Sequence, residues 1–148
     1  MKASDLQQYL YEHIPLSQAM QVEVSSAGQD SILLSAPLGP NINHQETVFG
    51  GSASAVAILA AWSLVQVRLK QAGIRNELVI QRNTMEYELP ISGAFTARSQ
   101  VQEKDWLAFM RTLQRKGRAR ITVSSVLEFN GQPAGRLQGE FVAFAAKG

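Results

Sequence analysis

The stretch NINHQETVFGGSASAVAILAAWS, residues 41–63, joins a polar loop directly to a long apolar segment through a pair of glycines, Gly50 and Gly51. Glycine is a poor helix former and costs about 0.8–1.0 kcal/mol per residue relative to alanine. Two glycines at the start of a buried helix therefore need a reason. Either they allow close packing of the helix, or they let a ligand approach the backbone N–H groups of its first turn.

The apolar segment predicts a helix over residues 51–71, about 30 Å long, with Gly73 as its C-cap. This helix is apolar nearly all round, which favours a position inside a sheet over one on the surface. Its longest unbroken apolar run, residues 55–62, is too short to cross a bilayer of about 30 Å. We therefore expect no membrane association.

The segments on either side of this helix predict one short helix and six strands. Ser4 is expected to cap a helix over residues 5–13 that Pro15 ends. Alternating or turn-bounded segments predict the strands, at residues 20–25, 31–38, 77–89, 95–102, 121–129 and 136–145. In the strand over 77–89, we expect Met85, Tyr87 and Leu89 to share one face, opposite the solvated Glu86 and Glu88.

Short connections favour antiparallel pairing of these strands. Asn130-Gly131 indicates a tight hairpin between the last two strands. Residues 103–116 fit either a short helix or an irregular excursion. The sequence therefore predicts an α+β fold in a single domain, residues 1–148, with one long central helix wrapped by a curved antiparallel sheet.

Composition excludes several classes of function. The chain has 148 residues, 45% hydrophobic and 18% charged, as in an ordinary globular domain. Its net charge of +2 is too small to indicate nucleic-acid binding. It has no cysteine and only two histidines, His13 and His44, and these lack metal-ligand spacing, so we expect no metal and no cofactor. The N-terminal residues do not form a secretory signal, and we expect a cytoplasmic protein.

Three motifs carry a resemblance to a known family: YEHIPLSQAM at residues 11–20, APLGPNINHQETVFGGS at 36–52 and LAAWSL at 59–64. The second is similar to the Asn-x-x-x-Thr-x-Phe-Gly-Gly run of hotdog-fold enzymes that act on acyl thioesters. The whole chain resembles the thioesterase-like domain found at the C-terminus of the acetyltransferase-like protein YiiD and as stand-alone bacterial proteins. The resemblance implies a hotdog fold and at least a homodimer, because hotdog sites normally lie between two subunits.

The candidate catalytic residues are Asn43, Gly51 and Glu46. A thioester oxygen at the start of the central helix would meet the N–H of Gly51 and the positive end of the helix dipole. The Asn43 side chain can donate a hydrogen bond without changing charge, or it can fix the loop by bonding nearby backbone, as we expect for Asn41. Glu46 could activate water, or it could lie in solvent before the helix.

The resemblance implies that the rest of the matched run contacts the substrate. His44 could act as an acid or a base, although a single loop histidine is often only polar. The implied substrate-binding residues of this run are His44, Thr47, Val48, Phe49, Gly50 and Ser52.

A basic run, RTLQRKGRAR at residues 111–120, contains no acidic residue. Arg118 and Arg120 would share one strand face, opposite Ile121 and Val123. Such a surface would attract an acidic acyl carrier protein or the phosphates of coenzyme A, or it could protect a strand edge. We include Arg115, Lys116 and Arg118 among the substrate-binding residues.

Some members of the resembled family decarboxylate malonyl-acyl carrier protein, which initiates fatty-acid synthesis. Many hydrolytic hotdog enzymes carry an acidic residue about two turns into the central helix, where residues 57–60 here are Ala-Ile-Leu-Ala. Decarboxylation needs no general base, so this departure favours a decarboxylase. Hydrolysis of acyl-coenzyme A or acyl carrier protein with Glu46 as base is the first alternative, and a non-catalytic acyl-thioester binding module is the second.

Overall fold

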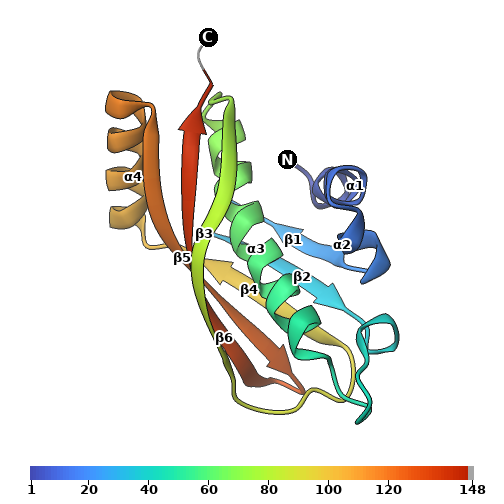
Figure 1. Cartoon of the computed structure of the whole chain (residues 1–148). Coiled ribbons are helices and arrows are strands. Elements are labelled where there is room, and N and C mark those ends of the chain that lie inside the picture. Colours follow the sequence, from blue (N-terminus) through green and yellow to red (C-terminus); the bar gives the residue numbers. More distant parts are fainter. Residues whose placement is uncertain (147–148) are drawn as a thin grey trace.

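The computed structural model describes residues 1–146 and contains one antiparallel sheet around a long helix (Figure 1). The helical elements are α1 (Ala3–His13), α2 (Pro15–Ala19), a 3-10 turn η1 (Gly39–Asn41), α3 (Gly50–Gln71) and α4 (Glu103–Lys116). The strands are β1 (Glu23–Ala27), β2 (Ser31–Ala36), β3 (Asn76–Tyr87), β4 (Phe95–Gln100), β5 (Arg118–Phe129) and β6 (Gln132–Ala145). Their order in the sheet is β1-β2-β4-β5-β6-β3, which confirms the predicted fold class.

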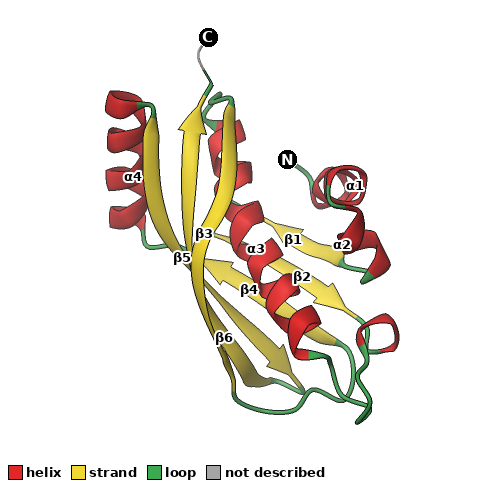
Figure 2. Cartoon of the chain, in the orientation of Figure 1, coloured by secondary structure: helices red, strands yellow, loops and turns green. Residues whose placement is uncertain are grey.

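Helix α3 forms the core and runs across the sheet (Figure 2). Its alanines let the strands approach closely, and Val56, Leu64 and Val65 are fully buried. Hydrogen bonds attach the middle of α3 to the sheet: the Ser125 hydroxyl donates to the Ala57 carbonyl at 2.8 Å, and the Trp62 indole donates to the Leu78 carbonyl at 3.0 Å. By length and composition α3 could cross a membrane, but 61% of its most apolar window is buried inside the fold.

Strands β5 and β6 form the predicted hairpin. Asn130 and Gly131 have φ angles of 53° and 73°, as a two-residue turn with primed geometry requires. Residues with inward side chains on β5, such as Ile121 and Val123, are buried, whereas Arg118 and Arg120 are exposed. The predicted facing of this strand is therefore confirmed.

Residues 103–116 form a helix, α4, because one of its faces is apolar. Trp106, Phe109 and Leu113 fall at spacings of three and four residues and are buried. Arg68 of α3 fastens the beginning of α4: its guanidinium lies 4.4 Å from the Trp106 ring centroid and 3.1 Å from a Glu103 carboxylate oxygen. Gly117 ends the helix with a φ of 73°.

Several local predictions were wrong. Ser4 is not an N-cap, because α1 begins at Ala3 after Lys2 and makes no side-chain cap hydrogen bond. Pro15 ends α1 but also starts the short helix α2, since a proline fits the first turn of a helix. The C-cap of α3 is Ala72, and Gly73 follows it in the left-handed conformation.

The end of β3 also departs from prediction. Tyr87 and Leu89 were expected on the buried face with Met85, but their side chains are 59% and 46% exposed. Strand β3 is the last strand of the sheet and pairs only with β6. Alternation predicts burial only where another layer covers the apolar face, and within the described chain no such layer covers this end of β3.

Candidate functional site

The N-terminus of α3 is open. Phe49 occupies the N-cap position without a side-chain cap, and the first turn contains no acidic residue. The first helical N–H to find a backbone acceptor is that of Ala53, which donates to the Phe49 carbonyl at 3.0 Å. Within the described chain, the N–H groups of Gly50, Gly51 and Ser52 have no acceptor. This end of the helix therefore presents hydrogen-bond donors and a partial positive charge.

Aromatic rings occupy the space beside both glycines. A Cβ on Gly51 would lie 2.3 Å from the nearest Phe49 ring atom, and one on Gly50 would lie 3.4 Å from the Tyr87 ring. The Phe49 ring is itself 58% exposed. Close packing against these rings therefore explains in part why glycine occupies both positions. The same absence of side chains leaves the backbone of the first turn accessible.

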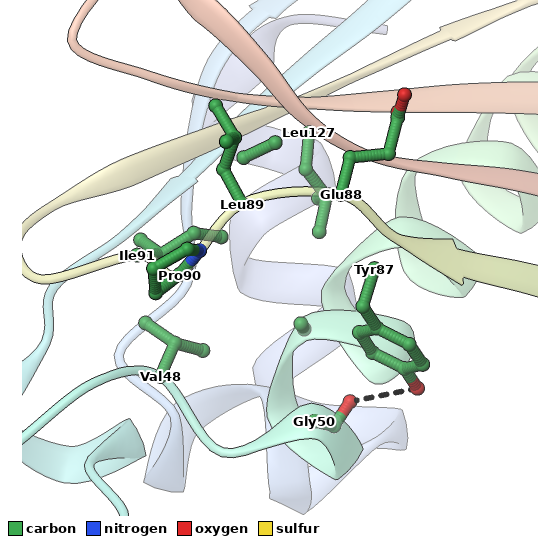
Figure 3. Close-up of a pocket in the computed structure, with 10 residues that line it drawn as sticks. Val48, Gly50, Tyr87, Glu88, Leu89, Pro90, Ile91 and Leu127 are labelled. Carbon is green, nitrogen blue, oxygen red and sulfur yellow. Dashed lines mark hydrogen bonds between the residues drawn. The ribbon is translucent and has the colours of Figure 1, made fainter. Parts of the chain in front are cut away.

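A pocket of about 270 Å³ opens beside this helix end (Figure 3). Its apolar wall is formed by Val48, Ala53, Ile91, Leu127 and Ala134. The segment that follows β3 forms the other side. The complete lining is Val48, Gly50, Ala53, Tyr87, Glu88, Leu89, Pro90, Ile91, Leu127 and Ala134. No lysine or arginine is among these residues, so the pocket suits an apolar or dehydrated acyl group.

Glu88 is the acidic residue of this lining, but its carboxylate points away from the pocket (Figure 3). The carboxylate forms an ion pair with Arg136 at 3.0 Å. The backbone N–H groups of Glu88 and Leu89 both donate to the Ala134 carbonyl, which fixes this segment against β6. The pocket wall is therefore held in place while its acidic group stays outside.

The loop before α3 is organised by Asn43. Its Oδ1 accepts hydrogen bonds from the backbone N–H groups of Gln45 and Thr47 at 2.8 and 3.1 Å. Its Nδ2 donates to the Thr47 hydroxyl at 2.9 Å. Asn43 thus fixes the loop conformation, which was one of its two expected roles. Asn41 is buried and its amide donates to the carbonyls of Met20 and Pro37, so its expected structural role is confirmed.

The other residues of the matched run separate into two groups. Val48 is buried in the pocket wall, and its N–H donates to the Ile91 carbonyl at 2.8 Å. Ser52 is half-buried in the first turn of α3. His44 and Glu46 are exposed on the loop, outside the pocket lining. Glu46 has a φ of 62°, a conformation that costs most non-glycine residues about 1–2 kcal/mol.

The basic residues predicted to bind the substrate lie away from the pocket at the start of α3. Arg115 and Lys116 are exposed at the end of α4, and Arg118 is exposed at the start of β5; we call these three the basic patch. A second pocket of about 410 Å³ there is lined by Thr112, Lys116, Arg118, Ala119, Arg120 and Val142. Leu127 follows Arg118 by nine positions along β5, about 30 Å of extended chain. One protomer therefore does not bring the patch and the α3 pocket together.

Sequence reasoning missed the contribution of the β3–β4 connection. Tyr87, Leu89 and Ile91 line the pocket although they follow Gly50 by more than thirty residues. Tyr87 and Leu89 were placed in the predicted strand over 77–89, but the position of this segment against α3 depends on the long-range pairing of β3 with β6. Within residues 1–146, no group of three or more His, Cys, Asp or Glu side chains is placed to hold a metal ion.

Comparison with known proteins agrees with this fold. The sequence model of the family described as "Putative thioesterase (yiiD_Cterm)" matches residues 3–145. A protein of unknown function from Chlorobaculum tepidum TLS has a similar structure, with 28% identity, a TM-score of 0.92, and coverage of 97% of this chain and 94% of that chain. A "putative thioesterase" from Shewanella oneidensis matches with 25% identity, a TM-score of 0.87 and coverage of 96% of each chain.

A thioesterase from Haemophilus influenzae shares the fold at 14% identity, with a TM-score of 0.79 and coverage of 98% of this chain and 92% of that chain. The central helix, the wrapped antiparallel sheet and these neighbours define a hotdog fold. The family match extends over nearly the whole chain, including the Asn43 loop and the open start of α3. The chain belongs to the thioesterase-like family described as "Putative thioesterase (yiiD_Cterm)".

Proposed function

We propose that this protein is an enzyme that acts on short acyl thioesters, and that its reaction is decarboxylation of malonyl-acyl carrier protein to acetyl-acyl carrier protein. The observation that carries the proposal is an apolar pocket at the open start of α3 into which none of the ten lining residues directs a carboxylate. Family membership supports acyl thioesters as the substrate class. The acetyl product would serve as a starter unit for fatty-acid synthesis.

The pocket offers what decarboxylation requires. The bond between the malonyl methylene carbon and its carboxylate breaks, carbon dioxide leaves, and the electron pair forms an enolate with charge on the thioester oxygen. The N–H of Gly51 at the helix N-terminus, together with the Asn43 amide, would stabilise this oxyanion. An apolar wall withdraws water from the departing carboxylate, which favours its loss as neutral carbon dioxide. Water then protonates the methylene carbon to give the acetyl thioester.

Hydrolysis is the second candidate, favoured by the thioesterase name of the family. It needs a general base to activate water. The side chains of residues 57–60 are not acidic, Glu46 lies on the exposed loop, and the Glu88 carboxylate is paired outside the pocket. A non-catalytic binding module would use the same pocket without turnover.

The assembly that we propose is a homodimer formed through β3. This strand leaves one edge unpaired over twelve residues within the described chain, and an exposed edge is a template for pairing with another copy. The exposed side chains of Phe49, Tyr87 and Leu89 lie near its end and would be covered by a partner. The partner copy would then complete the wall of the pocket.

The basic patch would contact the acidic surface of an acyl carrier protein, or the phosphates of coenzyme A. Antiparallel pairing of two β3 strands places the Asn76 end of one beside the Tyr87 end of the other. The patch lies at the Asn76 end, because Arg118 and Glu77 are both in register with Phe144. A carrier on one protomer would therefore serve the pocket of the other. We propose a cytoplasmic location, where such carriers act.

Product analysis tests the proposal. The purified protein is incubated with malonyl and medium-chain thioesters on carrier protein and on pantetheine, and the products are identified by mass spectrometry. Acetyl thioester is expected; free thiol would indicate hydrolysis, and unchanged substrate with measurable affinity would indicate a binding module. Glu46→Gln should leave decarboxylation largely intact, whereas it would cost about 100-fold or more if Glu46 were a general base.

A further inference from the structure

Tyr87 makes a hydrogen bond to the first residue of α3. Its hydroxyl donates to the Gly50 carbonyl oxygen at 3.2 Å (Figure 3). The ring lies along the side of Gly50, where a Cβ would come within 3.4 Å of a ring carbon. Tyr87 is the last residue of β3, so this contact connects the end of the edge strand to the open end of the central helix.

The acceptor of this bond belongs to the peptide group that carries the proposed oxyanion donor. The carbonyl of Gly50 and the N–H of Gly51 are two ends of one planar trans unit. Fixing the direction of the carbonyl oxygen therefore fixes the direction of the Gly51 N–H, which points the opposite way. This N–H has no acceptor within the described chain, so it is available to a ligand.

This peptide group needs an external restraint. It lies between two glycines, which have the widest choice of φ and ψ angles, in the first turn of a helix without a side-chain cap. The Gly50 carbonyl can accept both its helical hydrogen bond and that of Tyr87, because a carbonyl oxygen has two lone pairs. A second donor also polarises the peptide, which strengthens its N–H as a donor by roughly 10–30%.

We propose that Tyr87 is a positioning residue that orients and polarises the Gly50–Gly51 peptide, so that the Gly51 N–H is preorganised for negative charge on the thioester oxygen. This inference rests on the proposed function of Gly51 as oxyanion donor. The Tyr87 hydroxyl acts on this peptide and not on the substrate, while the ring remains part of the pocket lining. The pairing of two glycines with one tyrosine also explains how a flexible backbone can serve a reaction that requires fixed donors.

The variant Tyr87→Phe removes the hydroxyl and keeps the ring. Because Tyr87 is 59% exposed, the fold should persist. The matched control is Tyr11→Phe. Tyr11 lies on α1, outside the pocket, and the variant removes its hydroxyl, which donates to the Val22 carbonyl at 2.5 Å. Both variants lose the same kind of hydrogen bond, but Tyr87→Phe alone affects the Gly50–Gly51 peptide.

Two measurements are made on both variants. Steady-state kinetics with a malonyl pantetheine thioester should show that Tyr87→Phe lowers kcat about 2- to 10-fold, the worth of one net hydrogen bond, with KM unchanged within a factor of two. The ¹H–¹⁵N resonance of Gly51 should move upfield in its proton dimension, because the peptide loses the donor that polarises its carbonyl. Tyr11→Phe should change neither kcat nor the Gly51 resonance.

Three results would overturn the inference. One is an unchanged Gly51 resonance in Tyr87→Phe, whatever happens to activity. Another is a raised KM at constant kcat, which would make Tyr87 a substrate contact. The third is an equal Gly51 shift in the Tyr11→Phe control. If the wild-type protein shows no turnover, the proposed function fails, but the Gly51 resonance still decides whether Tyr87 positions this peptide.

Discussion

Replacing Asn43 separates its structural contribution from a chemical one. In Asn43→Ala, three hydrogen bonds of the side chain are lost, two from backbone N–H groups and one to the Thr47 hydroxyl. Each net hydrogen bond is worth about 0.5–1.5 kcal/mol, and half-burial places these in the lower part of that range. We therefore expect a loss of about 1.5–3 kcal/mol in the free energy of unfolding. For a chain of this size the melting temperature should fall by about 3–10 °C.

The variant Asn43→Asp provides the contrast. The carboxylate keeps an oxygen for the N–H groups of Gln45 and Thr47 but cannot donate to an oxyanion or to the Thr47 hydroxyl oxygen. Its melting temperature should lie closer to that of the wild type. If the amide of Asn43 donates to the developing oxyanion, turnover should fall about 100- to 1,000-fold in both variants, as when other oxyanion-hole side chains are removed.

Thermal unfolding and single-turnover kinetics with malonyl thioester measure these two effects separately. Near-normal turnover in Asn43→Asp would confine Asn43 to holding the loop and would remove it from the mechanism. An unchanged melting temperature in Asn43→Ala would refute the assignment of the three loop hydrogen bonds to stability. Kinetics are read only below the unfolding transition of each variant, so that loss of fold is not mistaken for loss of chemistry.

Leu127→Ala removes three carbons from the pocket wall, so the acyl chains accepted in a chain-length series should lengthen by about one to three carbons. Leu137→Ala, equally buried but outside the pocket, should cost a similar 2–5 kcal/mol without changing that profile. Glutamine at all three positions of the basic patch should weaken use of the carrier-borne substrate and flatten its salt dependence, while a pantetheine thioester reacts as before; equal losses would contradict docking. Burial, and then the nearby Glu23 carboxylate, raise the pKa of Tyr11 above its ordinary 10.0. Stability from this group is therefore present below pH 10 and lost as pH rises through the folded-state pKa, and Tyr11→Phe should remove that loss in alkaline urea titrations.

The sequence alone determined the architecture, because the spacing of apolar residues within each segment indicates whether it forms a helix or a strand and which face is buried. A helical segment apolar on every side must be buried, and with strands predicted on both sides of it in the sequence a sheet could cover it, as is found for α3. The alternation of Ile121 and Val123 with arginines set the facing of β5. Asn130-Gly131 set its hairpin, since both residues adopt positive φ. The loop motif before Gly50 also located the start of the candidate site.

Tertiary structure decided the composition of that site. Tyr87 and Leu89 obey strand alternation, but at the end of an edge strand nothing in the described chain covers them, so the buried face that was predicted became a pocket rim. The pocket joins segments near residues 48, 88, 127 and 134. Such contacts depend on strand register, and a register is a property of two segments at once, which the pattern within either segment does not contain.

The basic patch shows the same limit. Its residues lie close together in the sequence and are exposed, yet their distance from Gly51 could not be read from spacing. Strand β5 places Arg118 at the opposite end of the sheet from Leu127, because a strand advances about 3.3 Å per residue in one direction. Sequence thus determined which side chains are apolar, charged or flexible, whereas the paths of β3 and β5 through the sheet decided which of them meet at the start of α3.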